Sequence, residues 1–506
     1  MGKEKAKPGN GTEARRDNVR QAVNNACDQL NSDGVEPRNY VEQLSWLFFL
    51  KAFEASEDRR EDESAFEDVA YERRLDGKYR WSTWTRALTG QGQPIDGLKT
   101  AEEVFRFVNA DLFEKLTSLG DDTLGLQFQR IFSTIRNHSR RPGSFARVVS
   151  QVDRIDFNRQ ADVIELSEFY ERLLKDVAGD SAGYAGEFYT QRHIVKAMVE
   201  VVKPRLGDRI YDPCMGTAGF LFESAEYIRR HSPNMSGDDF ERFQKSTFFG
   251  NELKPLSYLL GVMNMILHGI DHARLALADT LERHENNVAE QHRFSAILSN
   301  PPYGGKMDRD SQGNFTIQSA ATEILFLQHI MANLAKGGRA AVVVPEGVMF
   351  RGGPDAKVRQ KLLTNFRLHT ILSLPPGAFL PYTPVKTNVL FFERPKNGRA
   401  TDTIWFYELS NDGFELTQTR KPKSGSQIPE FLSSWSKQIE NDNAWRIAFD
   451  EKRFEENGWD LRAQNPNRKD DYRHASAIEL VRSIRTKEER IFGLLEELEE
   501  MLAGEV

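Results

Sequence analysis

The segment Asn300-Pro301-Pro302-Tyr303 is the part of this sequence whose residue types and spacing most clearly suit chemistry. It directly follows an apolar run, "FSAILS". Proline has a fixed φ and no backbone N–H, so the turn is stiff and its carbonyls have few local donors. An amide side chain, bare carbonyls and an aromatic face in one rigid turn are suited to receive a ligand. A purely structural Pro-Pro turn is the alternative.

A glycine-containing loop lies between a predicted strand and a predicted helix in "RIYDPCMGTAGFLFESAEYI". The strand ends at Asp212, and Gly216 and Gly219 belong to the loop. This arrangement presents a helix N-terminus and bare amides to a ligand. The loop has neither the G-x-G-x-x-G spacing of the dinucleotide fingerprint nor the Lys-Ser/Thr pair of a P-loop. Taken alone, it is equally consistent with a structural turn.

Two carboxylates stand at the ends of the next two predicted strands, Glu252 in "FFGNELKPL" and Asp279 in "ALADTL". In related folds an acidic residue at the position of Glu252 accepts hydrogen bonds from ribose hydroxyls. Asp279 is suited to accept a hydrogen bond from an adenine amino group. A carboxylate at such a place can instead cap a helix. Three successive strand ends with suitable groups nevertheless indicate an adenosine-containing ligand at the carboxyl edge of a sheet. Because Asn300–Tyr303 ends the fourth strand beside that ligand, we take it as the catalytic segment.

The elements that would position these residues are short apolar strands that alternate with helices from about residue 180 onwards. This alternation predicts βαβ units and a mainly parallel sheet. The last two strands are joined by a short connection, which suggests an antiparallel pair at one edge. The predicted strands are Asp208–Asp212, Ser246–Asn251, Ala273–Asp279, Phe294–Asn300, Gly338–Pro345, His369–Leu374 and Thr387–Glu393.

Helical periodicity dominates on both sides of this alternation. Apolar residues at three- and four-residue spacing predict a helical domain over residues 18–178, after a disordered arm of residues 1–17. Residues 179–465 would form the domain that holds the sheet. Over residues 466–506 a narrow apolar stripe predicts a C-terminal helix, compatible with a coiled-coil seam for subunit assembly and equally with a surface helix.

Composition narrows the class of protein. The chain has 506 residues, a net charge of −7 and two cysteines, Cys27 and Cys214. So few cysteines argue against a disulfide framework or a cysteine zinc site, and we expect no metal site. No apolar run approaches the ~20 residues needed to cross a membrane and no signal peptide is recognisable, so we expect a cytoplasmic protein. Any nucleic acid would be bound through a local basic surface or a partner.

Several motifs together resemble a known family. "NPPY" after an apolar strand, preceded by "DPCMGTAGF", resembles the amino-methyltransferases that use S-adenosylmethionine, and "GEFYTQ" resembles their element at the methionine end of the cofactor, with Gln191 in place of the usual Pro. With "CDQLNS", "NYVEQLSWLFFLKAFE" and "GAFLPYTPVKTNVLFFE", the sequence is similar to the modification subunits of type I restriction–modification systems over roughly residues 18 to 460.

The resemblance implies an α/β fold: a Rossmann-like class I S-adenosylmethionine-dependent methyltransferase domain with an N-terminal helical domain and a C-terminal helical tail. It implies S-adenosyl-L-methionine as the cofactor. The residues it assigns to cofactor binding are Glu187, Phe188, Tyr189, Thr190, Gln191, Asp212, Gly216, Thr217, Ala218, Gly219, Asn251, Glu252, Asp279 and Thr280.

The implied reaction is methyl transfer to the exocyclic N6 of adenine in DNA. Asn300 and the carbonyl of Pro301 would accept hydrogen bonds from the amine as charge develops on its nitrogen. Tyr303 would stack on an adenine flipped out of the duplex. Phe379 is a candidate for the second stacking face, with a core phenylalanine as the alternative. The implied partners are DNA, a separate specificity subunit that chooses the target, a second copy of the modification subunit, and a restriction subunit.

Other readings of the same motifs stay open at this stage. The Asn-Pro-Pro-Tyr turn also occurs in methyltransferases that act on a protein glutamine or on RNA bases, and N4 of cytosine is a chemically possible acceptor. The methyltransferases that act on glutamine or RNA are typically shorter chains, without a helical domain before the methyltransferase domain. A third reading is an assembly scaffold in which bound S-adenosylmethionine acts as an effector, against which the intact Asn300–Tyr303 segment argues.

Overall fold

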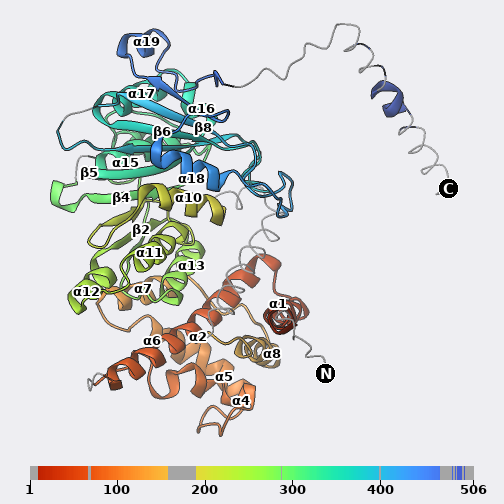
Figure 1. Cartoon of the computed structure of the whole chain (residues 1–506). Coiled ribbons are helices and arrows are strands. Elements are labelled where there is room, and N and C mark those ends of the chain that lie inside the picture. Colours follow the sequence, from red (N-terminus) through yellow and green to blue (C-terminus); the bar gives the residue numbers. More distant parts are fainter. Residues whose placement is uncertain are drawn as a thin grey trace, which may run out of the picture.

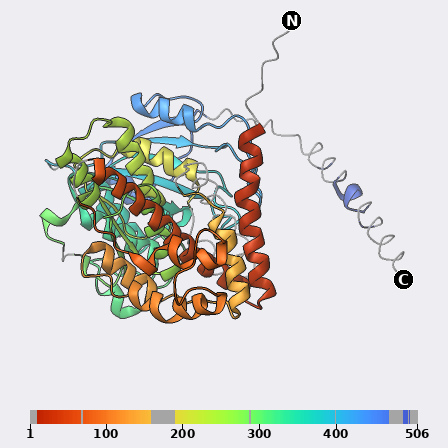
Figure 2. The same cartoon turned by 90° about the horizontal axis from the view of Figure 1, so that it is seen from below.

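The computed structural model places a group of helices against a large twisted sheet (Figure 1). It describes residues 10–66, 70–157, 190–285, 288–397 and 400–467, and positions 481, 485, 487–492 and 495. Seen from below, the N-terminal helices lie in front of the sheet (Figure 2). No helix in these described ranges is both long and apolar enough to cross a membrane.

The described chain up to residue 157 consists of helices and connecting turns, without a strand. Helix α2 carries the aromatic residues around which they pack. Phe49 and Phe53 are buried against Phe128, and Trp46 is buried against Phe113 and Phe145. The elements are α1 (Asn10–Ser32), α2 (Pro37–Phe66), α3 (Trp81–Trp84), α4 (Arg86–Thr89), α5 (Ala101–Phe107), α6 (Phe113–Leu116), α7 (Thr123–Phe132) and α8 (Pro142–Asp153), with the short helices Gly77–Tyr79 and Val108–Leu112.

Helix α1 corrects the expected extent of the N-terminal arm. The arm was expected over residues 1–17, but the helix begins at Asn10. Glu13, Ala14, Arg15 and Arg16 are good helix formers, so the charged composition that suggested an arm also extends the first turns of the helix.

In the part of the chain that the structure describes, the sheet has nine strands in the order β3-β2-β1-β4-β5-β7-β6-β8-β9. The pairs β3–β2, β2–β1, β1–β4, β4–β5 and β6–β8 are parallel. This sheet confirms the predicted methyltransferase fold. The strands are β1 (Ile210–Asp212), β2 (Phe248–Glu252), β3 (Arg274–Leu277), β4 (Phe294–Ser299), β5 (Leu334–Pro345), β6 (Arg367–Ser373), β7 (Thr387–Glu393), β8 (Thr403–Glu408) and β9 (Ala444–Ala448).

The expected antiparallel pair at an edge is wrong in its position. Strand β7 is antiparallel to β6, but it lies between β5 and β6 and is antiparallel to both. Its residues are buried on both faces except at Glu393, as an interior strand requires. The edge is formed by β8 and β9, an antiparallel pair that the sequence analysis missed.

Helices cover both faces of the sheet, so the buried residues form separate cores on its two sides. Helices α10, α11 and α13 belong to the core that also contains the N-terminal helices, and α15, α16 and α17 belong to the other. The remaining elements are α10 (Arg192–Val202), α11 (Gly219–His231), α12 (Gly237–Ser246), α13 (Pro255–Leu267), α14 (Arg309–Gln312), α15 (Thr322–Asn333), α16 (Glu346–Phe350), α17 (Pro354–Asn365), α18 (Ile428–Lys437), α19 (Glu451–Glu456) and the short helix Glu290–His292.

The N-terminal helices close the β3 edge of the sheet. Gln127 Nε2 donates to the carbonyl of Ala273 over 2.7 Å, and Arg60 Nε donates to Asp271 Oδ2 over 3.1 Å. Such contacts cover an edge whose backbone groups would otherwise be open to pairing with another strand. Of the predicted C-terminal helix, the described positions from 481 to 495 are helical and exposed, and its other residues lie outside the described ranges.

Candidate active site

A cleft opens at the carboxyl edge of the sheet, where β2, β3 and β4 end. Its empty space, including the open solvent at its mouth, is about 870 Å³. Five of the predicted site residues line it: Glu252, Asp279, Thr280, Asn300 and Pro302. The fold therefore brings the two strand-end carboxylates and the Asn-Pro-Pro segment to one cavity.

The glycine loop supports this cleft from behind. Gly216 has φ +53° and Ala218 has φ +62°, so the chain turns tightly before α11. The backbone N–H of Gly216 donates to Glu252 Oε2 over 2.9 Å, and that of Lys254 donates to Glu252 Oε1 over 2.8 Å. These two bonds hold the carboxylate at the end of β2. Close packing requires Gly250, because a Cβ there would lie 2.5 Å from Met215 Sδ.

Glu252 and Asp279 differ in their surroundings. Burial raises the pKa of Glu252, although the backbone donors at Lys254 and Gly216 oppose that shift. Asp279 is half-buried and accepts a hydrogen bond from the N–H of Leu281 over 2.8 Å. Both carboxylates have oxygen lone pairs to offer in the cleft, and ribose hydroxyls and an adenine amino group are donors that match them.

Asp212 joins two strands rather than lining the cleft. Its Oδ1 accepts from Ser299 Oγ over 2.8 Å and from the N–H of Cys214 over 3.1 Å, which ties the end of β1 to the end of β4. The side chain is 1% exposed. Burial raises its pKa to about 7 against the opposing effect of these hydrogen bonds. The Asp212 carboxyl therefore holds the ends of β1 and β4 together and does not line the cleft.

Asn251 and Thr280 belong to a hydrogen-bond chain behind the cleft. Asn251 Nδ2 donates to Tyr211 Oη over 3.0 Å and to Thr280 Oγ1 over 3.1 Å. Thr280 Oγ1 in turn donates to the carbonyl of Pro213. Thr280 reaches the cleft, whereas Asn251 lines a cavity on the other face of the sheet.

The Asn-Pro-Pro-Tyr turn is braced on both sides. Asn300 Nδ2 donates to Thr190 Oγ1 over 3.0 Å, and the Tyr303 hydroxyl donates to Asn300 Oδ1. The carbonyl of Pro302 accepts from Thr322 Oγ1 over 3.4 Å. Pro301 is buried beneath the turn. The bond from Tyr303 occupies the side-chain oxygen that the sequence analysis assigned to the substrate amine.

Several predicted cofactor residues lie elsewhere. Glu187, Phe188 and Tyr189 lie outside the described residues. Gln191 is 7% exposed at the start of α10, and its Nε2 has no hydrogen-bond partner among the described atoms. Thr217 turns its carbonyl toward Asn264 Nδ2, over 2.8 Å. Gly219 is the first residue of α11.

Phe379 is not placed as a stacking face. The side chain is 2% exposed and belongs to the core shared by the N-terminal helices and one face of the sheet. A base stacks on an exposed ring face, so we correct the expectation that Phe379 completes a base sandwich. The alternative, a core phenylalanine, describes its position.

The apolar residues of the cleft were not predicted from the sequence. Leu253 is 59% exposed at the mouth, which is unusual for a leucine unless something covers it. Leu281 and Phe326 lie deeper and form a small core cluster with Phe315 and Leu325. The position of Leu253, directly after a strand-end carboxylate, is the signal that points to it. An apolar surface beside two carboxylates fits a purine ring and its ribose, so the cleft fits the adenosine part of S-adenosylmethionine.

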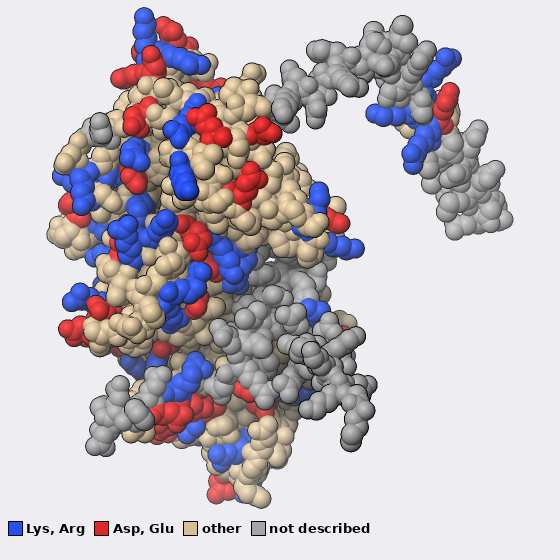
Figure 3. Space-filling view, in the orientation of Figure 1, with Lys and Arg blue, Asp and Glu red and all other residues tan. Residues whose placement is uncertain are grey.

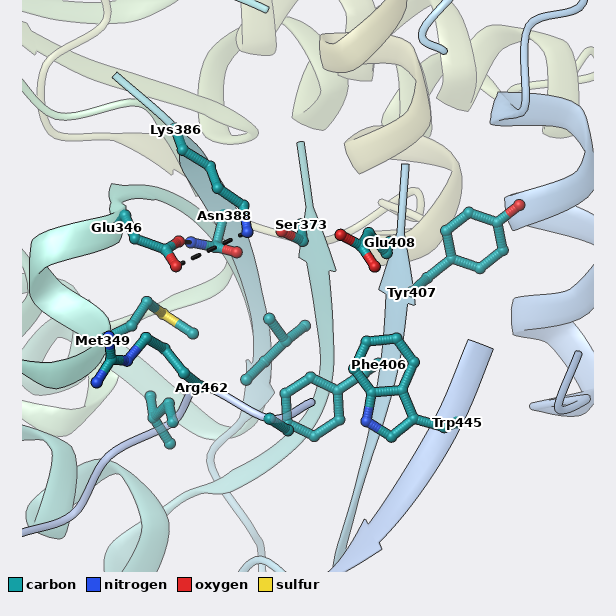
Figure 4. A pocket seen from close by; sticks show the side chains of 13 residues that line it. Glu346, Met349, Ser373, Lys386, Asn388, Phe406, Tyr407, Glu408, Trp445 and Arg462 are labelled. Carbon is teal, nitrogen blue, oxygen red and sulfur yellow. Dashed lines mark hydrogen bonds and ion pairs between the residues drawn. The ribbon is translucent and has the colours of Figure 1, made fainter. Parts of the chain in front are cut away.

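A second, smaller pocket lies farther along the same edge, beneath the ends of β6 and β8 (Figure 4). Asn388 Nδ2 donates to Glu346 Oε2 over 2.5 Å, and Lys386 Nζ lies 3.7 Å from Glu346 Oε1. Ser373 and Glu408 approach the same group from the neighbouring strands. The Glu346 contacts fix the start of β7 next to the end of β5, the strand that follows the Asn-Pro-Pro-Tyr turn.

The chain is similar to known proteins over most of its length. The family described as N-6 DNA Methylase matches residues 160–475, and the family described as HsdM N-terminal domain matches residues 19–152. The EcoEI methylase subunit, a type I restriction enzyme component of Escherichia coli, is 32% identical over 477 residues, or 91% of this chain and 92% of that protein.

Two solved structures are similar over almost the whole chain. The modification subunit assigned to a type I restriction enzyme of Vibrio vulnificus YJ016 has a TM-score of 0.78 at 33% identity, covering 92% of this chain and 99% of the other. A chain from a study of complex assembly and conformational transition in the type I restriction–modification system has a TM-score of 0.70 at 36% identity, covering 97% and 99%.

Proposed function

The chain belongs to the N-6 DNA methylase family, with the methylase subunits of type I restriction enzymes, and from this membership and its cleft we propose that it methylates N6 of an adenine flipped out of DNA. It is an adenine-specific DNA methyltransferase that uses S-adenosylmethionine. One observation carries the proposal: Asn300 and Pro302 line the same cleft as Glu252 and Asp279. Hydrogen-bond acceptors suited to the cofactor and hydrogen-bond acceptors suited to the substrate amine thus face one cavity.

The cofactor would be held by residues of the strand ends. Glu252 accepts the ribose hydroxyls, Asp279 accepts from the adenine amino group, and Leu253 covers the ring. The methionine end of the cofactor is proposed to contact Glu187, Phe188, Tyr189, Thr190 and Gln191. The loop that shapes this part of the site is proposed to consist of Gly216 to Gly219, together with Asp212. When bound, S-adenosylmethionine supplies an electrophilic methyl group.

The chain's own contribution is to position and polarise the amine. Its nitrogen is a weak nucleophile, because the lone pair is delocalised into the base. Asn300 Oδ1 and the Pro301 carbonyl accept its two N–H groups and stabilise the charge that develops on nitrogen. The Tyr303 hydroxyl donates to Asn300 Oδ1 in this structure, so on base entry the amine would share that oxygen with Tyr303 or displace it, since an amide oxygen has two lone pairs. The ring of Tyr303 is then available to stack on the base.

Target choice is proposed to come from a separate specificity subunit. The chain is acidic, with 75 Asp and Glu against 68 Lys and Arg, and on the face drawn in Figure 3 the two signs of charge are interspersed. A chain of this charge gains little nonspecific attraction to DNA. The similar Vibrio vulnificus chain is a modification subunit, and the other similar chain comes from a study of complex assembly.

We therefore propose a complex of two modification chains, one specificity subunit and a restriction subunit, acting on cytoplasmic DNA. The C-terminal residues 466–506 are proposed as the assembly helix.

The test is methyl transfer to DNA by the chain copurified with its specificity subunit. Transfer of labelled methyl to N6 of adenine in duplex DNA, and its loss in Asn300→Ala, is the expected result. Transfer to protein or RNA but not to DNA would overturn the proposal. Cofactor binding by both forms, measured in the same preparations, separates a defect in chemistry from a defect in folding.

A further inference from the structure

A second large cavity lies on the opposite face of the sheet from α11 and α13. It spans β1, β2 and β4, and its empty space, including open solvent at its mouth, is about 960 Å³. Between β3 and β4, the described residues form no α-helix, although they include the short helix Glu290–His292. The sheet face beside α15 is therefore hollow there rather than covered by a helix.

The walls of this cavity are positively charged. Arg209, Arg274 and Arg283 line it together with His284 and His292, and no acidic side chain is found among its described lining residues. Within the described ranges, none of the three arginines forms an ion pair with a carboxylate. Burial, and secondly the charge of Arg274, lowers the pKa of Arg209. Guanidinium groups gathered without counterions favour the binding of an anion.

Two of the arginines are held in place before any ligand arrives. The guanidinium of Arg209 lies 4.6 Å from the ring centre of Phe249 and 5.3 Å from that of Phe294. Its Nη2 donates to the carbonyl of His292 over 3.2 Å, while its buried Nε has no partner among the described atoms. Arg274 Nε donates to the carbonyl of Lys245 over 3.0 Å. Fixed guanidinium groups bind phosphate oxygens at a low cost in entropy.

The floor of the cavity is neutral and has an unused donor. His329 is 4% exposed, and burial lowers its pKa to about 3, so the ring is neutral. Its Nε2 lies 3.2 Å from Tyr211 Oη and 3.3 Å from Asn333 Nδ2. Both can donate to it, which assigns the ring hydrogen to Nδ1. That Nδ1 has no partner among the described atoms, so a buried donor remains unsatisfied.

We propose that this cavity binds a small phosphorylated ligand of the nucleoside phosphate class. Arg209, Arg274 and Arg283 contact the phosphates. The neutral floor of His329 and Asn333 contacts the uncharged part. The cavity is larger than a phosphate ion needs, and its floor offers hydrogen bonds without charge, which is why a nucleoside phosphate fits better than an inorganic anion. This site is separate from the methyl-transfer cleft, since neither Arg209 nor Arg283 lines the latter.

The test is equilibrium binding to the full chain by calorimetry. The probes are AMP, ATP and inorganic phosphate, with S-adenosylhomocysteine present in excess to fill the methyl-transfer cleft. We expect AMP or ATP to bind, and Arg283→Ala and Arg274→Ala each to weaken that binding about tenfold. Arg106→Ala, at an exposed arginine of α5, is the matched control and should leave it unchanged.

Each outcome decides the proposal. No saturable binding of either nucleotide, or binding that both cavity variants leave unchanged, overturns it. Binding of inorganic phosphate as tight as that of the nucleotides overturns the assignment to nucleoside phosphates. Unchanged S-adenosylhomocysteine affinity in Arg283→Ala shows that the variant is folded and that the loss is local.

Discussion

At the scale of single residues, Asn300 is shared between the resting structure and the proposed reaction. Its amide nitrogen donates to Thr190 and its amide oxygen accepts from Tyr303. The first bond fixes which atom of the amide faces the cleft. The second would be shared with, or exchanged for, a bond from the substrate amine, since an amide oxygen has two lone pairs. The two bonds therefore give the two neighbours different expected roles, one in orientation and one in gating the acceptor.

Replacing Asn300 tests the acceptor role. Asn300→Ala removes an oxygen that stabilises developing charge, and loss of one such group costs about 10²–10³-fold in kcat. Thr190→Val removes only the orienting bond, worth about 1 kcal/mol, so about a fivefold loss is expected. Single-turnover methyl transfer at saturating cofactor measures both. Equal effects of the two variants would contradict the distinction.

Replacing Tyr303 separates its ring from its hydroxyl. Tyr303→Phe keeps the face that stacks on the base and is expected to stay within about fivefold of wild type, since one hydrogen bond is lost. Tyr303→Ala loses stacking worth about 1–3 kcal/mol per base, or roughly 5–150-fold. The measurement is kcat/KM for a duplex containing the target. Tyr303→Phe as damaging as Tyr303→Ala would refute stacking as the main role.

Asp212 predicts how stability depends on pH. Burial raises its folded pKa to about 7, above an unfolded value near 4. Between about pH 4 and pH 7 the folded state therefore binds more protons than the unfolded state. This carboxyl consequently lowers stability as pH rises through that window.

Asp212→Asn removes the titration while keeping the Oδ1 acceptor used by Ser299 and Cys214. We expect the melting temperature of the variant, relative to wild type, to be higher at pH 8 than at pH 5. Thermal unfolding at the two pH values checks this, with the exposed Asp310→Asn as the control. A difference between variant and wild type that does not change with pH would exclude this role for Asp212.

The sequence predicted which residues lie together at the cleft better than it predicted the direction in which their side chains point. Strand-end position is sufficient to bring Glu252, Asp279 and Asn300 to one edge. It does not decide which side of the sheet a side chain takes, and Asn251 therefore lies on the other face. The burial of Phe379 depends on packing between distant segments, which no local pattern records.

At the scale of elements, the sheet was predictable where its strands alternate with helices. Those crossovers make β1 to β5 parallel, and short apolar runs mark each strand. The placement of β7 depends on which edge of β5 is unpaired, and this is determined by contacts between segments that are distant in the sequence. Strands β8 and β9 were missed because polar segments separate them in the sequence.

The junction between the N-terminal helices and the sheet gives a prediction at this scale. Asp271 is 9% exposed, and it is bound by Arg60 of α2 and by Ser56 Oγ, the latter over 3.3 Å. Arg60→Met leaves a buried carboxylate unpaired, which costs about 3 kcal/mol. We expect a clearly lower melting temperature. Adding Asp271→Asn should recover part of the loss.

A double-mutant cycle over Arg60 and Asp271 provides the check. A coupling energy above about 1 kcal/mol is expected for groups in direct contact. Additive effects would show that this pair does not hold the helices to the sheet. Exchange of Arg106 to Met, in an exposed pair with Glu102 on α5, is the control and should change stability by less than about 0.5 kcal/mol.

At the scale of the whole molecule, the chain combines the proposed methyl-transfer site with an acidic composition. The cleft holds groups for both cofactor and amine, yet a net charge of −7 gives little attraction to DNA. This combination is expected of a catalytic subunit that is brought to its target by a partner. The family resemblance read from the sequence is confirmed by the comparisons, since a family model matches residues 160–475 and a relative is 32% identical over 91% of this chain.

The most direct test of this account is modification-sensitive sequencing of the source genome. Cells that carry the wild-type protein are compared with cells that carry Asn300→Ala at matched protein levels. The account predicts N6-methyladenine at one recognition sequence in wild-type cells and its loss in the variant. An unchanged methylation pattern would contradict the central claim that this chain methylates adenine in DNA through Asn300.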